Sequence, residues 1–200
     1  MPSSARKSFF GVRAKARRLL DVSTHKKLRP ITYLEMEPAL HAALAALVSG
    51  WEAYVEKVVL ETIASMADPT NVVGSAVTQI LLDEARRNSE SFNTPNFENS
   101  RNFILRFTGY DPYSAMHSSR QQLTVQQTQT RLNEMLKVRH AFAHALQMPN
   151  FQWLSRYGLS SRLTKSAVED CDDVLSDVVT SIDSGLANYL ATTFGVTVNW

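Results

Sequence analysis

Residues 139–144 (RHAFAH) form the segment of this 200-residue chain whose side chains are best suited to chemistry. An imidazole exchanges protons near neutral pH, and a guanidinium is a planar, two-pronged donor that matches a phosphate or a carboxylate. His140 and His144 stand one helical turn apart and could also chelate a metal ion. No third ligand lies nearby in the sequence, and Glu134 projects from another side of the helix. We therefore expect no metal site and no cofactor.

Arg139 has an unusual position on the helix predicted for residues 124–147. It falls in the middle of an apolar stripe, where an uncompensated guanidinium would be very costly. The stripe consists of Leu132, Met135, Phe142 and Leu146. One interpretation is that Arg139 reaches the edge of the stripe or pairs with a core acid such as Glu52. The other is that it faces a water-filled groove, or a seam between two copies of the chain, as a phosphate receptor. The pattern alone leaves both open.

Positive charge is concentrated in the first 30 residues. They hold nine of the 21 Lys and Arg residues against one acid, a net charge of +8, whereas residues 31–200 carry −6. A basic arm on an acidic body is typical of a protein that binds a polyanion, although a solvated helix face or a transit peptide has a similar composition. We expect a basic arm over residues 1–30 and a helical domain over 31–200. The candidate contacts to a nucleic acid are Arg13, Lys15, Arg17 and Arg18.

The composition excludes several classes of protein. With 44% hydrophobic and 20% charged residues, the chain is too apolar for intrinsic disorder. The single cysteine, Cys171, excludes an intrachain disulfide framework and a cysteine-based zinc cluster. The longest apolar run, Ala39–Gly50, is interrupted by His41 and is too short to cross a bilayer. No secretory segment follows the basic arm, so we expect a cytoplasmic protein without membrane contact.

Helical periodicity dominates the sequence, and seven Gly and seven Pro residues are few for an all-β fold. The strongest stripe, from about residue 38 to 66, consists of Leu40, Leu44, Leu47, Trp51, Tyr54 and Val58. Further helices are predicted over 72–87, 102–107, 124–147 and 164–194. The last has Thr164 as N-cap and an apolar stripe of Val168, Cys171, Leu175, Val178 and Ile182, and Gly185 inside it weakens it slightly. These patterns predict an all-α bundle of four to five core helices behind a basic N-terminal helix.

The order of these features resembles the HEPN (higher eukaryotes and prokaryotes nucleotide-binding) domain. The Arg-x4-His spacing lies between an amphipathic helix and a long C-terminal helix, as in that superfamily. Residues 47–55 (LVSGWEAYV) are similar to the first core helix of the RiboL-PSP branch, in which a polar Ser/Glu pair is followed by an aromatic residue. Residues 94–96 and 107–111 fit its middle loop and helix, and 163–200 fit its last helix and terminal Gly-x4-Trp. The resemblance covers most of residues 35–200.

The resemblance implies roles for individual residues. Arg139 and His144 match the catalytic pair, and His140 occupies a position where members often have Asn or another polar residue. Ser49 and Glu52 are candidate supports on the first core helix. Ala145 stands where many members have Gly. No Tyr follows two residues after His144, so the variant found in nucleotidyltransferase-paired toxins is not matched.

The activity implied is metal-independent cleavage of single-stranded RNA to 2′,3′-cyclic phosphate and 5′-hydroxyl ends, in defence or as a growth-arresting toxin. On an ideal helix, side chains five residues apart point about 140° away from each other. Arg139 and His144 would then meet only across a two-fold homodimer, which is the family's usual assembly. The expected partners are RNA, a second copy and an inhibitor or antitoxin. Two other hypotheses stay open: an inactive module that binds RNA, a nucleotide or a protein, and a helical interaction protein with a closed motif helix.

Overall fold

Six α-helices make up most of the part of the chain that the structure describes, residues 2–24, 32–67, 71–90, 92, 94–158 and 160–198 of a computed structural model. They are α1 (Ser4–Thr24), α2 (Tyr33–Ser65), α3 (Val72–Glu90), α4 (Phe97–Thr108), α5 (Val125–Ala143) and α6 (Lys165–Phe194). A 3-10 turn, η1 (Tyr113–Ala115), follows α4, and an antiparallel hairpin of β1 (Ser155–Tyr157) and β2 (Ser160–Arg162) precedes α6. The predicted all-α bundle is confirmed. The hairpin was not predicted.

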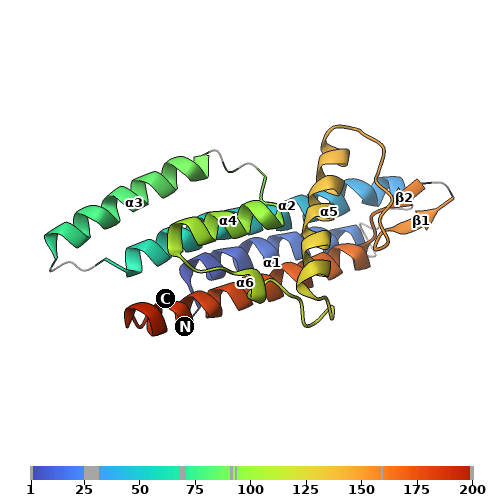
Figure 1. Cartoon of the computed structure of the whole chain (residues 1–200). Coiled ribbons are helices and arrows are strands. Elements are labelled where there is room, and N and C mark those ends of the chain that lie inside the picture. The colour runs from blue at the N-terminus through green and yellow to red at the C-terminus, as the bar shows by residue number, and fades with distance from the viewer. Residues whose placement is uncertain are drawn as a thin grey trace.

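Three long helices, α1, α2 and α6, lie side by side and form the core (Figure 1). The apolar stripe predicted on α2 is buried along its whole length, from Leu40 to Val58. The stripe predicted on α6 is equally buried, and Thr164 caps that helix by accepting a hydrogen bond from the Ala167 N–H at 3.2 Å. These stripes account for the bundle because each helix has an apolar face that only a neighbouring helix can cover.

Helix α1 packs into this core through one apolar face, which consists of Ala5, Phe9, Ala16 and Leu20. At Gly50 of α2, an added Cβ would lie 3.1 Å from Val12 of α1, so the small residue permits a close approach of the two helices. The basic N-terminal helix is therefore also a core element. The predicted boundary between residues 30 and 31 lies outside the described residues, as do Lys26, Lys27, Arg29 and Trp200.

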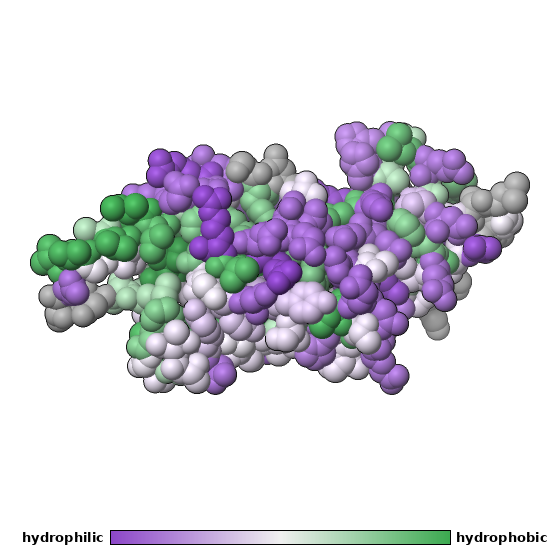
Figure 2. Space-filling view, in the orientation of Figure 1, coloured by the Kyte–Doolittle hydropathy of each residue, from purple (hydrophilic) through white to green (hydrophobic). Residues whose placement is uncertain are grey.

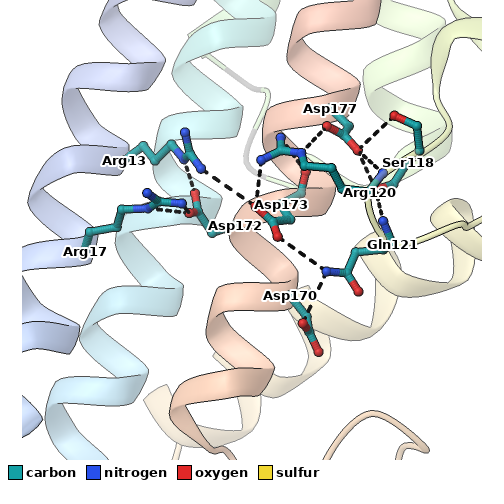
Figure 3. Close-up of polar contacts among 10 residues, drawn as sticks. Arg13, Arg17, Ser118, Arg120, Gln121, Asp170, Asp172, Asp173 and Asp177 are labelled. Carbon is teal, nitrogen blue, oxygen red and sulfur yellow. Dashed lines mark hydrogen bonds and ion pairs between the residues drawn. The ribbon is translucent and has the colours of Figure 1, made fainter.

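Ion pairs connect the polar face of α1 to α6 (Figure 3). Asp172, which is 1% exposed, accepts hydrogen bonds from Arg13 at 2.5 Å and from Arg17 at 2.7 Å. Arg120, in the loop after η1, binds the same helix through Asp173 and Asp177. Part of the charge asymmetry in the sequence thus reflects pairing between a basic helix and an acidic one.

Helix ends differ from the predicted ones where capping overrides the apolar pattern. Helix α2 begins at Tyr33 rather than near Pro38, because the Thr32 backbone N–H donates to the Glu35 carboxylate at 2.8 Å and starts the helix earlier. Helix α4 begins at Phe97 because the Asn96 side chain accepts from the Asn99 N–H at 2.8 Å.

Helix α3 contacts the bundle mainly through α2 and leaves an apolar face exposed, visible as the green area at one end of Figure 2. Its exposed side chains are Val72, Val73, Val77, Ile80 and Leu81. Within the described residues, none of the helices combines the length and the apolar character that a membrane span requires.

Candidate functional site

Helix α5 carries the Arg-x4-His segment and is fixed at its N-terminus by a capping box. The Thr124 N–H donates to the Gln127 side chain at 2.9 Å, and the Thr124 hydroxyl accepts from the Gln127 N–H at 3.3 Å. Its buried face is formed by Thr128, Leu132, Met135, Val138 and Ala141. The capped start and the buried face together determine how residues 139–144 are oriented relative to the core.

The predicted apolar stripe around Arg139 is only half right. Leu132 and Met135 are buried, but Phe142 is 42% exposed and Leu146 is 56% exposed. The buried face continues through Val138 and Ala141, because the helical period brings those positions over Met135. Arg139 therefore lies beside the core, half-buried, and not at the centre of a packed stripe.

The helix ends at the histidine of the motif in a Schellman turn. His144 is the C-cap, with φ −108° and ψ 13°, and Ala145 follows with φ +51°. The Leu146 N–H donates to the Ala141 carbonyl at 2.8 Å, and the Ala145 N–H donates to the Phe142 carbonyl at 3.2 Å. The left-handed position is one that glycine adopts without strain, so the alanine here is held at a steric cost.

A pocket of about 460 Å³ wraps around this end of α5. We call it the motif pocket; its wall includes Arg139, His140, His144, Lys137, Leu146 and Thr94. One chain thus brings Arg139 and His144 to the same pocket, which the ideal-helix estimate of 140° did not foresee. The lining includes residues from different sides of the last helical turn, and Arg139 and His144 are both among them.

The histidines of the motif lie against each other in this pocket. The rings of His140 and His144 are 4.3 Å apart between centroids and tilted by 47°. Both side chains are exposed, and neither they nor Arg139 form a side-chain hydrogen bond or ion pair with another described residue. Two proton-exchanging rings and one guanidinium are therefore available to a ligand.

Glu52 and Ser49, the predicted supports, are on α2 and are not among the described residues that line the motif pocket. Burial raises the pKa of the Glu52 carboxyl, and the positive charge of Arg139 partly offsets that rise. Glu52 therefore interacts with Arg139 by long-range electrostatic attraction, and the two side chains, both among the described residues, form no ion pair. Ser49 is exposed on α2.

The four basic residues predicted to contact RNA fall into two groups. Arg13 and Arg17 are engaged by Asp172. Lys15 and Arg18 are exposed and form no hydrogen bond or ion pair with another described residue. Only the second pair offers positive charge that the fold leaves unused.

Lys137 and Thr94 line the motif pocket but were missed from the sequence. Lys137, His140 and His144 are spaced i, i+3 and i+7, so the helical period could have identified the lysine. Thr94 has no such signal, because it reaches the pocket from a loop 45 residues before Arg139. Its loop is anchored by the Trp51 indole, which donates to the Pro95 carbonyl at 2.9 Å.

Comparison with known proteins assigns the chain to a family. Among the described residues, no group of three or more His, Cys, Asp or Glu side chains is arranged to hold a metal ion. No curated protein and no solved structure matches the chain. A family model described as RiboL-PSP-HEPN matches residues 14–188, which include the whole of α5 and the motif pocket. Because this match spans far more than half of the sequence, the chain belongs to the RiboL-PSP-HEPN family.

Proposed function

We propose that this protein is a metal-independent endoribonuclease that cuts single-stranded RNA, with Arg139 and His144 as its catalytic residues. Membership of a HEPN family points to a nuclease or RNA-related function. The observation that carries the finer proposal is the motif pocket, in which the side chains of Arg139, His140 and His144 form no hydrogen bond or ion pair with another described residue. A helix that served packing alone would have a closed pocket and a salt-bridged Arg139.

The proposed reaction is transesterification within the RNA chain. A 2′-hydroxyl loses its proton and attacks the adjacent phosphorus, and the bond to the 5′-oxygen breaks as that oxygen takes up a proton. The products are a 2′,3′-cyclic phosphate and a 5′-hydroxyl end. His144 moves one of these protons, and His140, against its ring, orients it. Arg139 holds the phosphate oxygens, on which negative charge grows in the transition state.

A homodimer would complete this chemistry, because one proton must be removed and another supplied. Phe142 and Leu146, beside Arg139, expose apolar surface that a second copy could cover. His144 of one copy and Arg139 of the other could then share one phosphate. HEPN domains often dimerise, which supports this arrangement. Sedimentation at micromolar concentration should give a species of twice 22.4 kDa; a monomer with and without RNA would rule the dimer out.

The decisive test is cleavage of single-stranded RNA in excess EDTA, with the product ends identified by mass spectrometry. Wild-type protein should yield cyclic phosphate ends, and His144→Ala and Arg139→Ala should each slow cleavage by roughly 10²- to 10⁴-fold with helical content retained. His117→Ala, an exposed histidine outside the motif pocket, is the matched control and should cut normally. RNA binding without cleavage by the wild type would instead indicate an inactive binding module.

A nuclease of this kind would act on cytoplasmic RNA, in defence or as a growth-arresting toxin restrained by an inhibitor protein. Induced expression in a bacterial host should then stop growth with the wild type and not with His144→Ala. Normal growth with both, at equal protein levels, would count against the toxin role and leave the cleavage assay to decide the activity.

A further inference from the structure

A second pocket, of about 480 Å³, adjoins the motif pocket and shares Thr94 with it. It lies between the end of α3 and α4, and its wall includes Phe92, Phe103, Asn102 and Arg106. Its size is in the range of small-molecule sites. A chain molecule that occupies the motif pocket could therefore place its next unit in this second pocket.

The wall between the two pockets is held in place from two sides. The Asn99 side chain on α4 donates to the Thr94 carbonyl at 2.9 Å, and the Trp51 indole donates to the Pro95 carbonyl at 2.9 Å. The Asn96 side chain caps α4 directly after this wall. The spacing between the pockets is therefore set by α2 and α4, which are themselves in contact.

The lining of the second pocket combines aromatic faces with amide and guanidinium groups. The half-buried ring of Phe92 is stacked on the ring of Phe103, which is only 8% exposed, with centroids 5.1 Å apart and planes 27° apart, so Phe92 is the aromatic ring that a ligand can reach. Asn102 is exposed, and its amide forms no hydrogen bond with another described residue, so both its donor and its acceptor are available. Arg106 is 62% exposed; Asn88 accepts a hydrogen bond from it at 3.2 Å, and Glu84 forms an ion pair with it at 3.7 Å, so that its guanidinium plane is held in place.

These groups match the chemistry of an unpaired nucleobase. Bases of single-stranded RNA stack on aromatic side chains and on guanidinium planes, and amide side chains read their hydrogen-bonding edges. An amide that offers a donor and an acceptor together distinguishes bases by their edge pattern.

We propose that the second pocket receives the nucleobase next to the cut phosphate, and that Asn102 sets which base is preferred. This inference rests on the proposed function, because it assigns the neighbouring site for the same RNA. Asn102 is a specificity residue in this scheme and takes no part in moving protons.

The test compares wild type, Asn102→Ala and Asn188→Ala on a pool of short single-stranded RNAs with randomised sequence, followed by sequencing of the product ends. Asn188 is an exposed asparagine of α6 outside both pockets and serves as the matched control. Wild type and Asn188→Ala should share a preference for one base beside the cut. Asn102→Ala should lose about tenfold of that preference, as expected for one lost base contact. A preference unchanged by Asn102→Ala, or no preference in the wild type, overturns the proposal.

Binding separates failure of this inference from failure of the proposed nuclease. If the wild type cuts no RNA, the nuclease proposal fails. The proposal that the second pocket binds a nucleobase is then tested by the affinities of the protein for tetranucleotides of U, C, A and G. Fluorescence anisotropy should then show unequal affinities for the wild type and nearly equal ones for Asn102→Ala. Phe92→Leu, which keeps apolar volume without an aromatic face, should weaken all four by about tenfold. The proposal is overturned if the wild type binds all four tetranucleotides with equal affinity, or if Asn102→Ala discriminates among them as the wild type does.

Discussion

The ring of His41 on α2 lies flat against the ring of Phe142 on α5, with centroids 3.9 Å apart and planes 5° apart. His41 is 3% exposed, and neither of its ring nitrogens has a hydrogen-bond partner among the described residues. The nearest acid, Glu37, is 3.9 Å away and one turn earlier on the same helix. The stack joins the last turn of the motif helix to the core.

This stack predicts a loss of stability in mild acid. Burial lowers the pKa of His41 from its ordinary value of 6.5 to about 4. Below pH 6.5 the histidine is protonated in the unfolded chain but stays neutral in the folded protein. The free energy of unfolding therefore falls between pH 6.5 and pH 4, by up to roughly 3 kcal/mol. His41→Phe should be at least as stable at pH 7 and should lack this share of the pH dependence. Urea unfolding of both proteins across this range measures it; parallel curves would show that His41 does not contribute.

Ala145→Gly should stabilise the protein. The φ of +51° at Ala145 is a left-handed conformation that costs an L-residue on the order of 1 kcal/mol and that glycine adopts freely. Because glycine also gains entropy in the unfolded chain, we expect a net gain of about 0.5 kcal/mol in the free energy of unfolding. Ala53→Gly, at an exposed position inside α2, is the control and should lose about 1 kcal/mol. Equal losses in both variants would contradict the strained turn.

Asp172→Asn should destabilise the contact between α1 and α6. It removes the charge that pairs with Arg13 and Arg17 at a position that is almost fully buried, at a cost of about 2 kcal/mol. Asp83→Asn breaks an exposed pair with Arg86 on α3 and should change stability by less than about 0.5 kcal/mol. Chemical unfolding compares the two. If Asp172→Asn and Asp83→Asn change the free energy of unfolding equally, apolar packing alone holds α1 in place.

The same ion pairs predict how RNA affinity depends on salt. Lys15 and Arg18 are exposed and available to phosphates, so replacing both by Ala should reduce the slope of log affinity against log salt by about 1.4. Replacing Arg13 and Arg17 by Ala should leave the slope nearly unchanged, since both guanidinium groups are already paired within the fold, with the carboxylates of Asp172 and Asp173. Titrations at three or more salt concentrations measure both slopes. Equal effects of the two pairs would show that RNA displaces Asp172 from its arginines.

Local patterns in the sequence were sufficient to predict which segments are helical and which faces of α2 and α6 are buried. The stripes on α2 and α6 are buried as predicted, because the helical period decides which side chains share a face. The Thr164 cap is a local hydrogen bond and was equally predictable. Gly185 was expected only to weaken its helix slightly. The fold brings the Tyr110 hydroxyl so close to Gly185 that a side chain there would collide with it.

The sequence by itself thus predicted the all-α class from helical periodicity and the family from its resemblance to the HEPN domain. It also singled out Arg139, His140 and His144, which line the motif pocket together because they lie close in the chain at one helix end. Tertiary structure decided that Arg13 and Arg17 pair with Asp172, more than 150 residues away. It also decided that Thr94 meets the end of α5 in the motif pocket, and that His41 lies under Phe142. Contacts of this kind depend on how helices cross in space, and no period of one helix carries that information.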